Sequence, residues 1–419
     1  MDKQLLVYVD LDGDLHLAGR LWAHHRRGRE SASFEYDGSW LRFPARFALE
    51  PALTLGKGPH HTAADRTLFG AIGDSAPDRW GRALIQREER RKARAEERLP
   101  RTLGEIDYLV GIGDVTRQGA LRFAELKDGP FLAAGDRTQI PPLVRLRELL
   151  DAALRITADE ERDDDIKLLL APGSSLGGAR PKASVIDQKG QLLIAKFPHH
   201  DDQIRISLWE ALALTLAAKA GISTPKWRIE NIGGKAVLLL HRFDREDGRR
   251  IPFLSAMSML GAADNESHSY LEIADAIRQY GARTEEDCAQ LWRRVVFNVL
   301  ISNTDDHLRN HAFLYESGGW RLAPAYDLNP VPQDIKARVL TLAIDEADGT
   351  ASLDLALSVA AHFRLKGDAP RRIVAEVGAA VASWRREAKA LGLTAKEIDR
   401  MASAFEHDAP KKTPERTAR

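Results

Sequence analysis

The order of strand-like and helix-like patterns along the chain limits the folds open to it. Residues 4–50 alternate apolar and polar side chains around Asp-Gly turns, which predicts a small antiparallel sheet. The apolar runs 192–197 and 237–240 predict two buried strands, and after residue 255 almost every periodic segment is helical. Small sheets followed by a mass of helices predict an α+β chain whose later part has two lobes.

The length of the chain predicts more than one domain. At 419 residues it exceeds one ordinary hydrophobic core, and two or three domains are expected. Proline and glycine cluster between residues 125 and 143, so we place a boundary near residue 135. The expected parts are a β-rich N-terminal subdomain (1–135), a strand-containing lobe (136–240), a helical lobe (241–406) and a disordered polar tail (407–419).

Periodicity and capping residues place several helices. The most charged one covers residues 78–98, where arginines alternate with glutamates. This alternation favours ion pairs along the helix over contact with nucleic acid. Residues 143–155 and 206–220 are also expected to be helical. Thr394 and Glu397 have the spacing of a capping box and predict a helix near the C-terminus.

Composition argues against some classes of site and partner. The 61 basic and 61 acidic residues cancel, so no global field draws the chain to nucleic acid or to a membrane surface. Cys288 is the only cysteine, which excludes an internal disulfide and argues against a thiolate-rich zinc site. The N-terminus shows no basic leader and no long apolar stretch, so we expect a cytoplasmic protein.

Three residues late in the chain have the spacing of a phosphotransferase site. Asp305 and Asn310 lie five residues apart in a loop expected after the apolar helix 291–300, and Asp327 follows seventeen residues later. In kinases an aspartate accepts the proton of the attacking hydroxyl, while an asparagine and a second aspartate hold metal ions. Amide and carboxylate oxygens suit magnesium, a hard cation. The spacing therefore predicts Asp305 as the catalytic base, with Asn310 and Asp327 as magnesium ligands.

A lysine and a glutamate in apolar surroundings predict the nucleotide end of the same site. Lys196 lies in the apolar run 192–197, where it must reach solvent or pair with a buried anion. Glu210 is the only charged residue of segment 207–218 and projects from a largely apolar face. Kinases pair such a lysine and glutamate to hold nucleotide phosphates. The alternative is that Glu210 simply lies at a lobe surface.

The glycines at positions 173, 177 and 178 precede this strand. They allow backbone amides to approach a polyphosphate, although the segment has no Walker motif and alone fits a surface turn equally well. A different interpretation groups His307 and His311 with Asp305 as an iron or zinc site. That interpretation leaves Lys196 and Glu210 unexplained. Ordinary solvated loop residues are the simplest alternative.

Five motifs in this order resemble the HipA family. They are Ser175-Leu-Gly-Gly-Ala-Arg-Pro-Lys182, Ile194-Ala-Lys-Phe-Pro198, His241-Arg-Phe-Asp-Arg245, Asn303-Thr-Asp-Asp-His-Leu-Arg-Asn310 and Ala325-Tyr-Asp-Leu-Asn329. Segments 73–82 and 119–123 resemble the family's N-terminal subdomain, so the resemblance covers nearly the whole chain. It implies a two-lobed protein-kinase-like fold behind a β-rich subdomain, and a serine/threonine kinase acting as the toxin of a type II toxin–antitoxin module.

The resemblance also implies roles for single residues and for partners. ATP binding would involve Lys196, Glu210, Gly177, Gly178, the backbone of Arg242 and Phe243 at an adenine hinge, and Asp244 near the ribose. Asp305 would be the base, with Mg²⁺ on Asn310 and Asp327. Ser175, or the adjacent Ser174, would be autophosphorylated, and the added charge would repel nucleotide phosphates.

The implied partners are a HipB-like helix-turn-helix antitoxin and a protein substrate, for which the family points toward aminoacyl-tRNA synthetases. DNA would be contacted only through the antitoxin, since no helix-turn-helix signature stands out in this chain. Two alternatives stay open. The chain could act mainly as a regulatory binding protein and co-repressor, or it could phosphorylate a small molecule.

Overall fold

The structure, a computed structural model, describes residues 3–26, 28–133, 140–170, 178–264 and 266–407. The chain divides into two units, of which unit 1 contains residues 1–201 and 230–261, and unit 2 contains residues 202–229 and 262–419. This division does not test the functional parts expected from the sequence, and they stay a prediction. Within the described ranges, no helix is both long and apolar enough to cross a bilayer.

The first sheet of unit 1 is antiparallel, with the strand order β4-β3-β2-β1-β5. Its strands are β1 (Lys3–Leu11), β2 (Asp14–Arg26), β3 (Arg29–Tyr36), β4 (His60–His61) and β5 (Leu121–Ala124). Asp12 and Gly13 join β1 to β2 with φ of 53° and 92°, the left-handed conformation that a two-residue Asp-Gly turn requires. Leu5, Val7 and Val9 are fully buried. The expected N-terminal sheet is therefore confirmed.

The sequence suggested that the second Asp-Gly pair of this region forms a turn between strands. The structure does not have this turn. Asp37 is instead the N-cap of α1 (Gly38–Arg42), and its carboxylate accepts a hydrogen bond from Ser39 N at 2.8 Å. Trp40 on this helix is fully buried, and its indole N–H donates to Phe47 O at 3.2 Å. Aspartate suits a cap as well as a turn, and burial of the tryptophan favours the helix.

A second sheet of unit 1 has the order β6-β7-β9-β8. Its strands are β6 (Lys182–Ile186), β7 (Leu192–Lys196), β9 (Lys235–His241) and β8 (Trp227–Ile232), whose first three residues belong to unit 2. Three helices share one apolar core with β6, β7 and β9, namely α3 (Arg79–Ala95), α5 (Leu146–Thr157) and α6 (Asp163–Leu170). Leu149, Leu193 and Leu239 are fully buried there. The helix predicted at residues 143–155 and the strands predicted at 192–197 and 237–240 are therefore confirmed.

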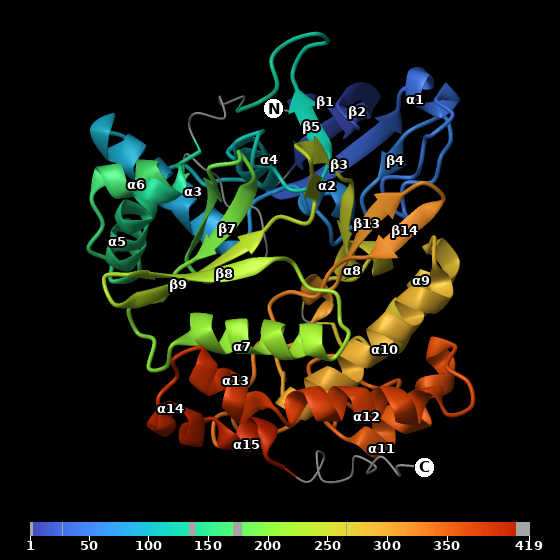
Figure 1. The fold of residues 1–419 in the computed structure, drawn as a ribbon. Helices are drawn as coiled ribbons and strands as arrows, with labels where there is room; N and C mark the ends of the chain where they lie inside the picture. The colour runs from blue at the N-terminus through green and yellow to red at the C-terminus, as the bar shows by residue number, and fades with distance from the viewer. Residues whose placement is uncertain (1–2, 27, 134–139, 171–177, 265, 408–419) are drawn as a thin grey trace. The chain divides into compact units, whose positions relative to one another are not determined.

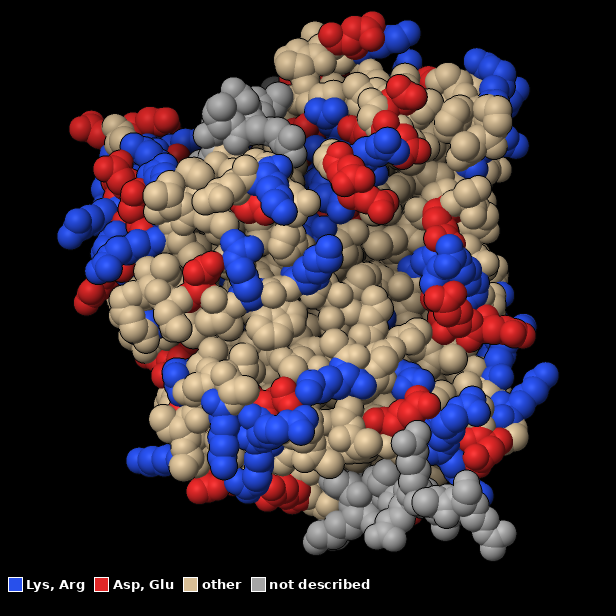
Figure 2. Space-filling view, viewed as in Figure 1, with Lys and Arg blue, Asp and Glu red and all other residues tan. Residues whose placement is uncertain are grey.

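The predicted ion pairs along α3 are confirmed for Arg91 and Glu88, whereas Arg82 and Arg87 pair with residues outside the helix. Arg91 pairs with Glu88 at 2.7 Å, and Arg87 lies 2.5 Å from Glu161. The helix begins behind Asp78, which accepts a hydrogen bond from Gly81 N at 2.8 Å. On the face shown in Figure 2, basic and acidic side chains are interspersed. The other described elements of unit 1 include α2 (Gly70–Gly73), α4 (Glu105–Val110), η2 (Leu143–Arg145), β10 (Arg245–Glu246), β11 (Arg249–Arg250), β12 (Phe253–Ser255) and α8 (Ala256–Leu260).

Unit 2 is mainly helical. Its helices include α7 (Ile206–Lys219), α9 (Tyr270–Tyr280), α10 (Thr284–Ile301), α11 (Leu353–Ser358), α12 (Ala369–Val381), α13 (Trp384–Ala390), α14 (Ala395–Arg400) and α15 (Ala402–Phe405). Trp292, Phe297 and Leu300 of α10 are fully buried, because this helix packs against α9, α11, α12 and α15. Figure 1 shows α7 along α12 and α13, which it contacts.

The stretch after residue 255 is less uniformly helical than expected, because β13 (Ala312–Glu316) and β14 (Gly319–Leu322) form an antiparallel hairpin. The predicted capping box at α14 is confirmed, with Thr394 N donating to Glu397 Oε2 at 2.9 Å. His407, the first residue of the predicted tail, is buried, and residues 408–419 lie outside the described residues.

Candidate active site

The loop that carries Asp305 begins where α10 ends. Ser302 caps the helix in the left-handed conformation (φ 51°), and Asn303 N bonds Asn298 O at 3.0 Å, so the chain turns sharply. The loop closes through a short 3₁₀ helix, η3 (Leu308–Asn310). Asn310 is buried and its Nδ2 donates to Asp305 O at 3.4 Å. The segment from Asp305 to Asn310 thus folds back on itself and brings these two residues together.

The two adjacent aspartates of this loop have opposite environments. Asp306 is buried, and its Oδ2 accepts hydrogen bonds from Tyr270 OH at 2.6 Å and Asn298 Nδ2 at 2.8 Å, with His311 Nε2 also at 2.8 Å. Burial alone would raise the pKa of Asp306, but the charge of His311 and the hydrogen bonds from His311 and Tyr270 hold it below its ordinary value. By contrast, the side chain of Asp305 is 73% exposed.

Asp327 lies in a segment bound to the same loop. Tyr326 OH donates to Arg309 O at 2.7 Å, and Asn329 N donates to Asn303 Oδ1 at 3.3 Å. Asp327 itself has a φ of 57°, which is uncommon for a residue other than glycine and is a form of strain frequent at functional sites. The loop and this segment therefore hold Asp305, Asn310 and Asp327 on neighbouring stretches of unit 2.

The predicted nucleotide residues lie on defined elements. Lys196 is the last residue of β7, paired in register with Leu238 of β9, in unit 1. Glu210 is buried on α7, in unit 2. Gly178 has a φ of 97°, and its carbonyl accepts a hydrogen bond from Lys182 Nζ at 3.2 Å. Gly173, Ser174, Ser175 and Gly177 lie outside the described residues. The pairing of Lys196 with Glu210 stays a prediction.

The proposed hinge residues follow β9, where Arg242 and Asp244 are buried and Phe243 is partly exposed. Arg242 Nε donates to Asp244 Oδ1 at 2.7 Å, and its Nη1 donates to Thr116 O at 2.6 Å. Asp244 Oδ2 accepts from Arg242 at 2.5 Å, from Arg245 Nη1 at 2.8 Å and from Gly119 N at 2.8 Å. Burial would raise the pKa of Asp244, but Arg242 and Arg245 hold it well below its ordinary value. Four protein donors thus occupy a carboxylate with about four acceptor positions, and its role near a ribose stays a prediction.

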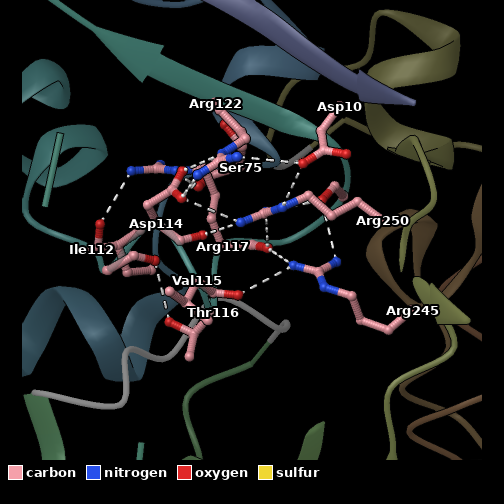
Figure 3. Close-up of polar contacts among 12 residues, drawn as sticks. Asp10, Ser75, Ile112, Asp114, Val115, Thr116, Arg117, Arg122, Arg245 and Arg250 are labelled. Carbon is pink, nitrogen blue, oxygen red and sulfur yellow. Dashed lines mark hydrogen bonds and ion pairs between the residues drawn. The ribbon is translucent and has the colours of Figure 1, made fainter. Parts of the chain in front are cut away.

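These contacts belong to a larger buried charge cluster that the sequence did not predict, and Figure 3 shows its part around Arg117, Arg122, Arg245 and Arg250. Its members are Asp10, Asp114, Arg117, Arg122, Arg242, Asp244, Arg245 and Arg250. Arg122 pairs with Asp114 at 2.6 Å, and Arg250 Nη2 donates to Asp114 O at 2.5 Å. The arginines thereby satisfy carbonyl groups of segment 111–119 and connect it to the hinge. Arginines repeated just behind an apolar strand, at 242, 245 and 250, were the sequence signal.

Arg117 has the most enclosed charge of this cluster. Its guanidinium is fully buried and donates to Ser75 O at 2.9 Å and Ile112 O at 3.1 Å. Burial lowers the pKa of Arg117 to about 9, with the Asp114 charge opposing that shift.

A second buried ion pair, also missed from sequence, joins Lys182 Nζ to Asp78 Oδ2 at 2.7 Å. It anchors the strand after the glycine segment to the N-terminus of α3.

Transition-metal chemistry finds little support at the loop. His311 contacts Asp306 rather than Asp305, inside the buried hydrogen-bond network. Within the ranges that the structure describes, three potential ligands gather instead at His199, His200 and Asp201, and the last two are exposed.

Residues 174–385 match the family described as HipA-like C-terminal domain, which is half of the chain. The chain belongs to this family. A solved structure of the Shewanella oneidensis MR-1 toxin–antitoxin system, HipA with HipB and its operator DNA, aligns with 96% of this chain and 95% of that one, at a TM-score of 0.68 and 16% identity. This likeness confirms the predicted α+β, kinase-like HipA fold.

Two curated relatives are more similar in sequence. "Putative kinase Y4mE" of Sinorhizobium fredii is 27% identical over 37% of this chain and 41% of its own length. A "Putative kinase" of Haemophilus influenzae is 24% identical over 43% of this chain and 61% of its own length. The chain thus spans about half the length of the curated relatives that it matches.

Proposed function

We propose that this HipA family member is an ATP- and Mg²⁺-dependent serine/threonine protein kinase. The observation that carries the proposal is the contrast between Asp306 and Asp305. The carboxylate of Asp306 is occupied inside the fold, while that of Asp305 is open to a substrate, beside the amide of Asn310. The names of the relatives agree with a kinase.

In the proposed reaction, Asp305 accepts the proton of a serine or threonine hydroxyl as its oxygen forms a bond to the γ-phosphorus of ATP. The bond from this phosphorus to the bridging oxygen breaks, and ADP leaves with the electron pair. Because Nδ2 of Asn310 is used by Asp305 O, its amide oxygen can serve as a ligand. Asn310 and Asp327 would hold Mg²⁺, which neutralises phosphate charge when bound. The donor set fits such a hard cation.

Binding of the nucleotide would use Lys196, supported by Glu210, on the phosphates. The backbone around Arg242 and Phe243 would contact adenine. Gly177 and Gly178 would let backbone amides approach the phosphates. Autophosphorylation of Ser175 or Ser174 would place about two negative charges in this loop and so weaken nucleotide binding.

The proposed partners follow the family. HipA of S. oneidensis was solved with HipB and operator DNA, which supports a helix-turn-helix antitoxin that would carry the DNA contacts of this protein. We further propose a toxin that inhibits growth by phosphorylating a cytoplasmic protein, with aminoacyl-tRNA synthetases as the first class to test. A co-repressor role that needs no phosphoryl transfer is the second candidate, favoured by the same HipA–HipB–DNA complex.

Labelling with γ-labelled ATP tests the proposal. Wild-type protein should label itself or an added protein, and Asp305→Asn should lower the rate by about 100-fold or more, since a general base is lost. Asp368→Asn, at an exposed aspartate of the same unit, is the matched control and should stay active. Equal labelling by Asp305→Asn, or no transfer by wild type, would contradict the proposal. Label only in small hydroxyl compounds would indicate a small-molecule kinase.

The co-repressor role needs a separate measurement. Operator binding is compared for the antitoxin alone, with wild type and with Asp305→Asn. If both proteins tighten operator binding equally while only wild type transfers phosphate, the two functions coexist. If operator binding tightens and wild type transfers no phosphate, binding is the function of the chain.

A further inference from the structure

The segment after Asp327 returns to the candidate catalytic loop and hydrogen-bonds to it. Val331 N donates to Ser302 O at 3.1 Å, and Thr341 N donates to Thr304 O at 3.2 Å. Both ends of the excursion 331–341 are therefore fixed to the loop. Residues between them are held close to Asp305 without belonging to its motif.

Lys336 is the cation that this excursion brings to the loop. Its Nζ donates to Thr304 O at 3.2 Å and lies 3.8 Å from Asp305 Oδ1. The lysine side chain is 46% exposed and that of Asp305 73%. An ion pair so exposed contributes little to stability, because water and salt screen it. Stability alone thus gives no strong reason for a lysine here.

Two other cations near the loop have their guanidinium groups directed elsewhere. Arg309 pairs with Asp264, an exposed ion pair. Arg338 holds the end of α10, with Nε donating to Ser302 Oγ at 3.1 Å and Nη2 to Val299 O at 2.9 Å. Lys336 is the one of the three whose charge lies at the Asp305 carboxylate.

We propose that Lys336 is a further catalytic residue, which donates hydrogen bonds to the phosphoryl group in transit between ATP and the hydroxyl held by Asp305. The inference rests on the proposed kinase function. An ammonium carries three donors on a flexible stem, so Lys336 can keep Thr304 O and still reach a phosphoryl oxygen. Negative charge on those oxygens must be stabilised during transfer, and a fixed cation beside the base does this.

Lys336 takes part in no covalent step. The hydroxyl proton moves to Asp305, the new P–O bond forms, and the electron pair of the broken bond leaves with ADP. Lys336 remains protonated throughout. Its removal should therefore slow the chemical step and leave the affinity for ADP nearly unchanged.

The test compares Lys336→Met, Lys336→Arg and Lys366→Met, an exposed lysine elsewhere in unit 2. We expect Lys336→Met to lower kcat about tenfold or more with KM for ATP within about twofold, and Lys336→Arg to recover part of kcat. Lys366→Met should match wild type. The affinity for Mg²⁺ and ADP with aluminium fluoride, which mimics the phosphoryl group in transit, should fall about tenfold in Lys336→Met, while that for ADP alone should not.

Each outcome of these measurements supports the proposed role of Lys336 or overturns it. If Lys336→Met keeps wild-type kcat, or loses affinity for ADP and for its aluminium fluoride complex equally, the lysine has no role in transfer. A loss of kcat with a lowered unfolding temperature, which Lys336→Arg does not restore, would assign it a purely structural role. An inactive wild type would remove the kinase proposal, and this inference with it.

Discussion

The carboxylate of Asp244 accepts a hydrogen bond from the backbone amide of Gly119 at 2.8 Å, joining residues 125 positions apart in the chain. Arg242 and Arg245 bind the same carboxylate. The proposed adenine hinge is therefore fastened to segment 111–119 within unit 1. Changes in that early segment can reach the hinge through Asp244, although no residue of the segment belongs to the kinase motif.

Asp244→Asn should lower the free energy of unfolding by about 3 kcal/mol or more, because two buried arginines lose their charge partner. Comparison of ATP with 2′-deoxy-ATP shows what else Asp244 does. If its carboxylate serves only the cluster, the variant should weaken both nucleotides equally. A variant that loses a wild-type preference for ATP, with little loss of stability, would instead assign Asp244 to the ribose. Urea unfolding and nucleotide titration supply the two measurements.

The two neighbouring aspartates of the loop should respond oppositely to the same substitution. Asp306→Asn should destabilise by about 3 kcal/mol, since its amide would face the donors Tyr270 OH and Asn298 Nδ2 and leave His311 without its anion. Asp305→Asn should change stability by less than about 0.5 kcal/mol, because the side chain is exposed. Thermal unfolding of both variants checks this. Similar losses in the two would remove the distinction on which the choice of base rests.

Local patterns in the sequence were enough to predict several elements. The apolar run before Lys196 and the capping box at Thr394 need only neighbouring residues, and the structure has both. Asp37 shows the limit of such patterns, because aspartate before glycine suits a turn or a cap, and the choice depended on burial of Trp40.

The site was predictable only where its residues are close in sequence. Asp305 and Asn310 lie on one turn, and their spacing reflects that turn directly. The contact of Asp244 with Gly119 and the approach of Lys336 to Asp305 involve segments separated by 125 and 31 residues. Nothing local marks such contacts, because tertiary packing brings the segments together. In the sequence, Lys336 resembles an ordinary surface residue, because its approach to Asp305 depends on where its segment lies in the fold.

Gly19 offers a test of packing in the first sheet. An added Cβ there would overlap the carbonyl oxygen of Glu35 and the ring of Phe34. Because both neighbours are held within β3, Gly19→Ala should destabilise by about 2 to 3 kcal/mol. Gly56→Ala is the matched control, since a Cβ at that position meets no atom within 4 Å. Urea unfolding that gives equal midpoints for the two variants would contradict this close approach of β2 and β3.

Glu50 should make the stability of the protein depend on pH. This side chain is buried, and burial raises the pKa of Glu50 to about 7, with the charge of Asp74 adding to the shift, while hydrogen bonds from Ala71 N and Gly70 N and the charge of Arg66 oppose it. The folded protein therefore holds this proton more tightly than the unfolded chain, whose glutamates have a pKa near 4.3. Its contribution to stability is complete below that value and is lost as pH rises through about 7.

Glu50→Gln removes the titration while keeping an acceptor for Ala71 N, which lies 2.5 Å from Glu50 Oε2. Between pH 5 and 8, wild type should lose about 2 to 3 kcal/mol of unfolding free energy relative to this variant. Glu160→Gln, at an exposed glutamate of the same unit, should follow wild type. Urea unfolding at the two pH values measures the difference. Parallel pH dependence of Glu50→Gln and wild type would mean that Glu50 is already ionised in the folded protein at pH 5.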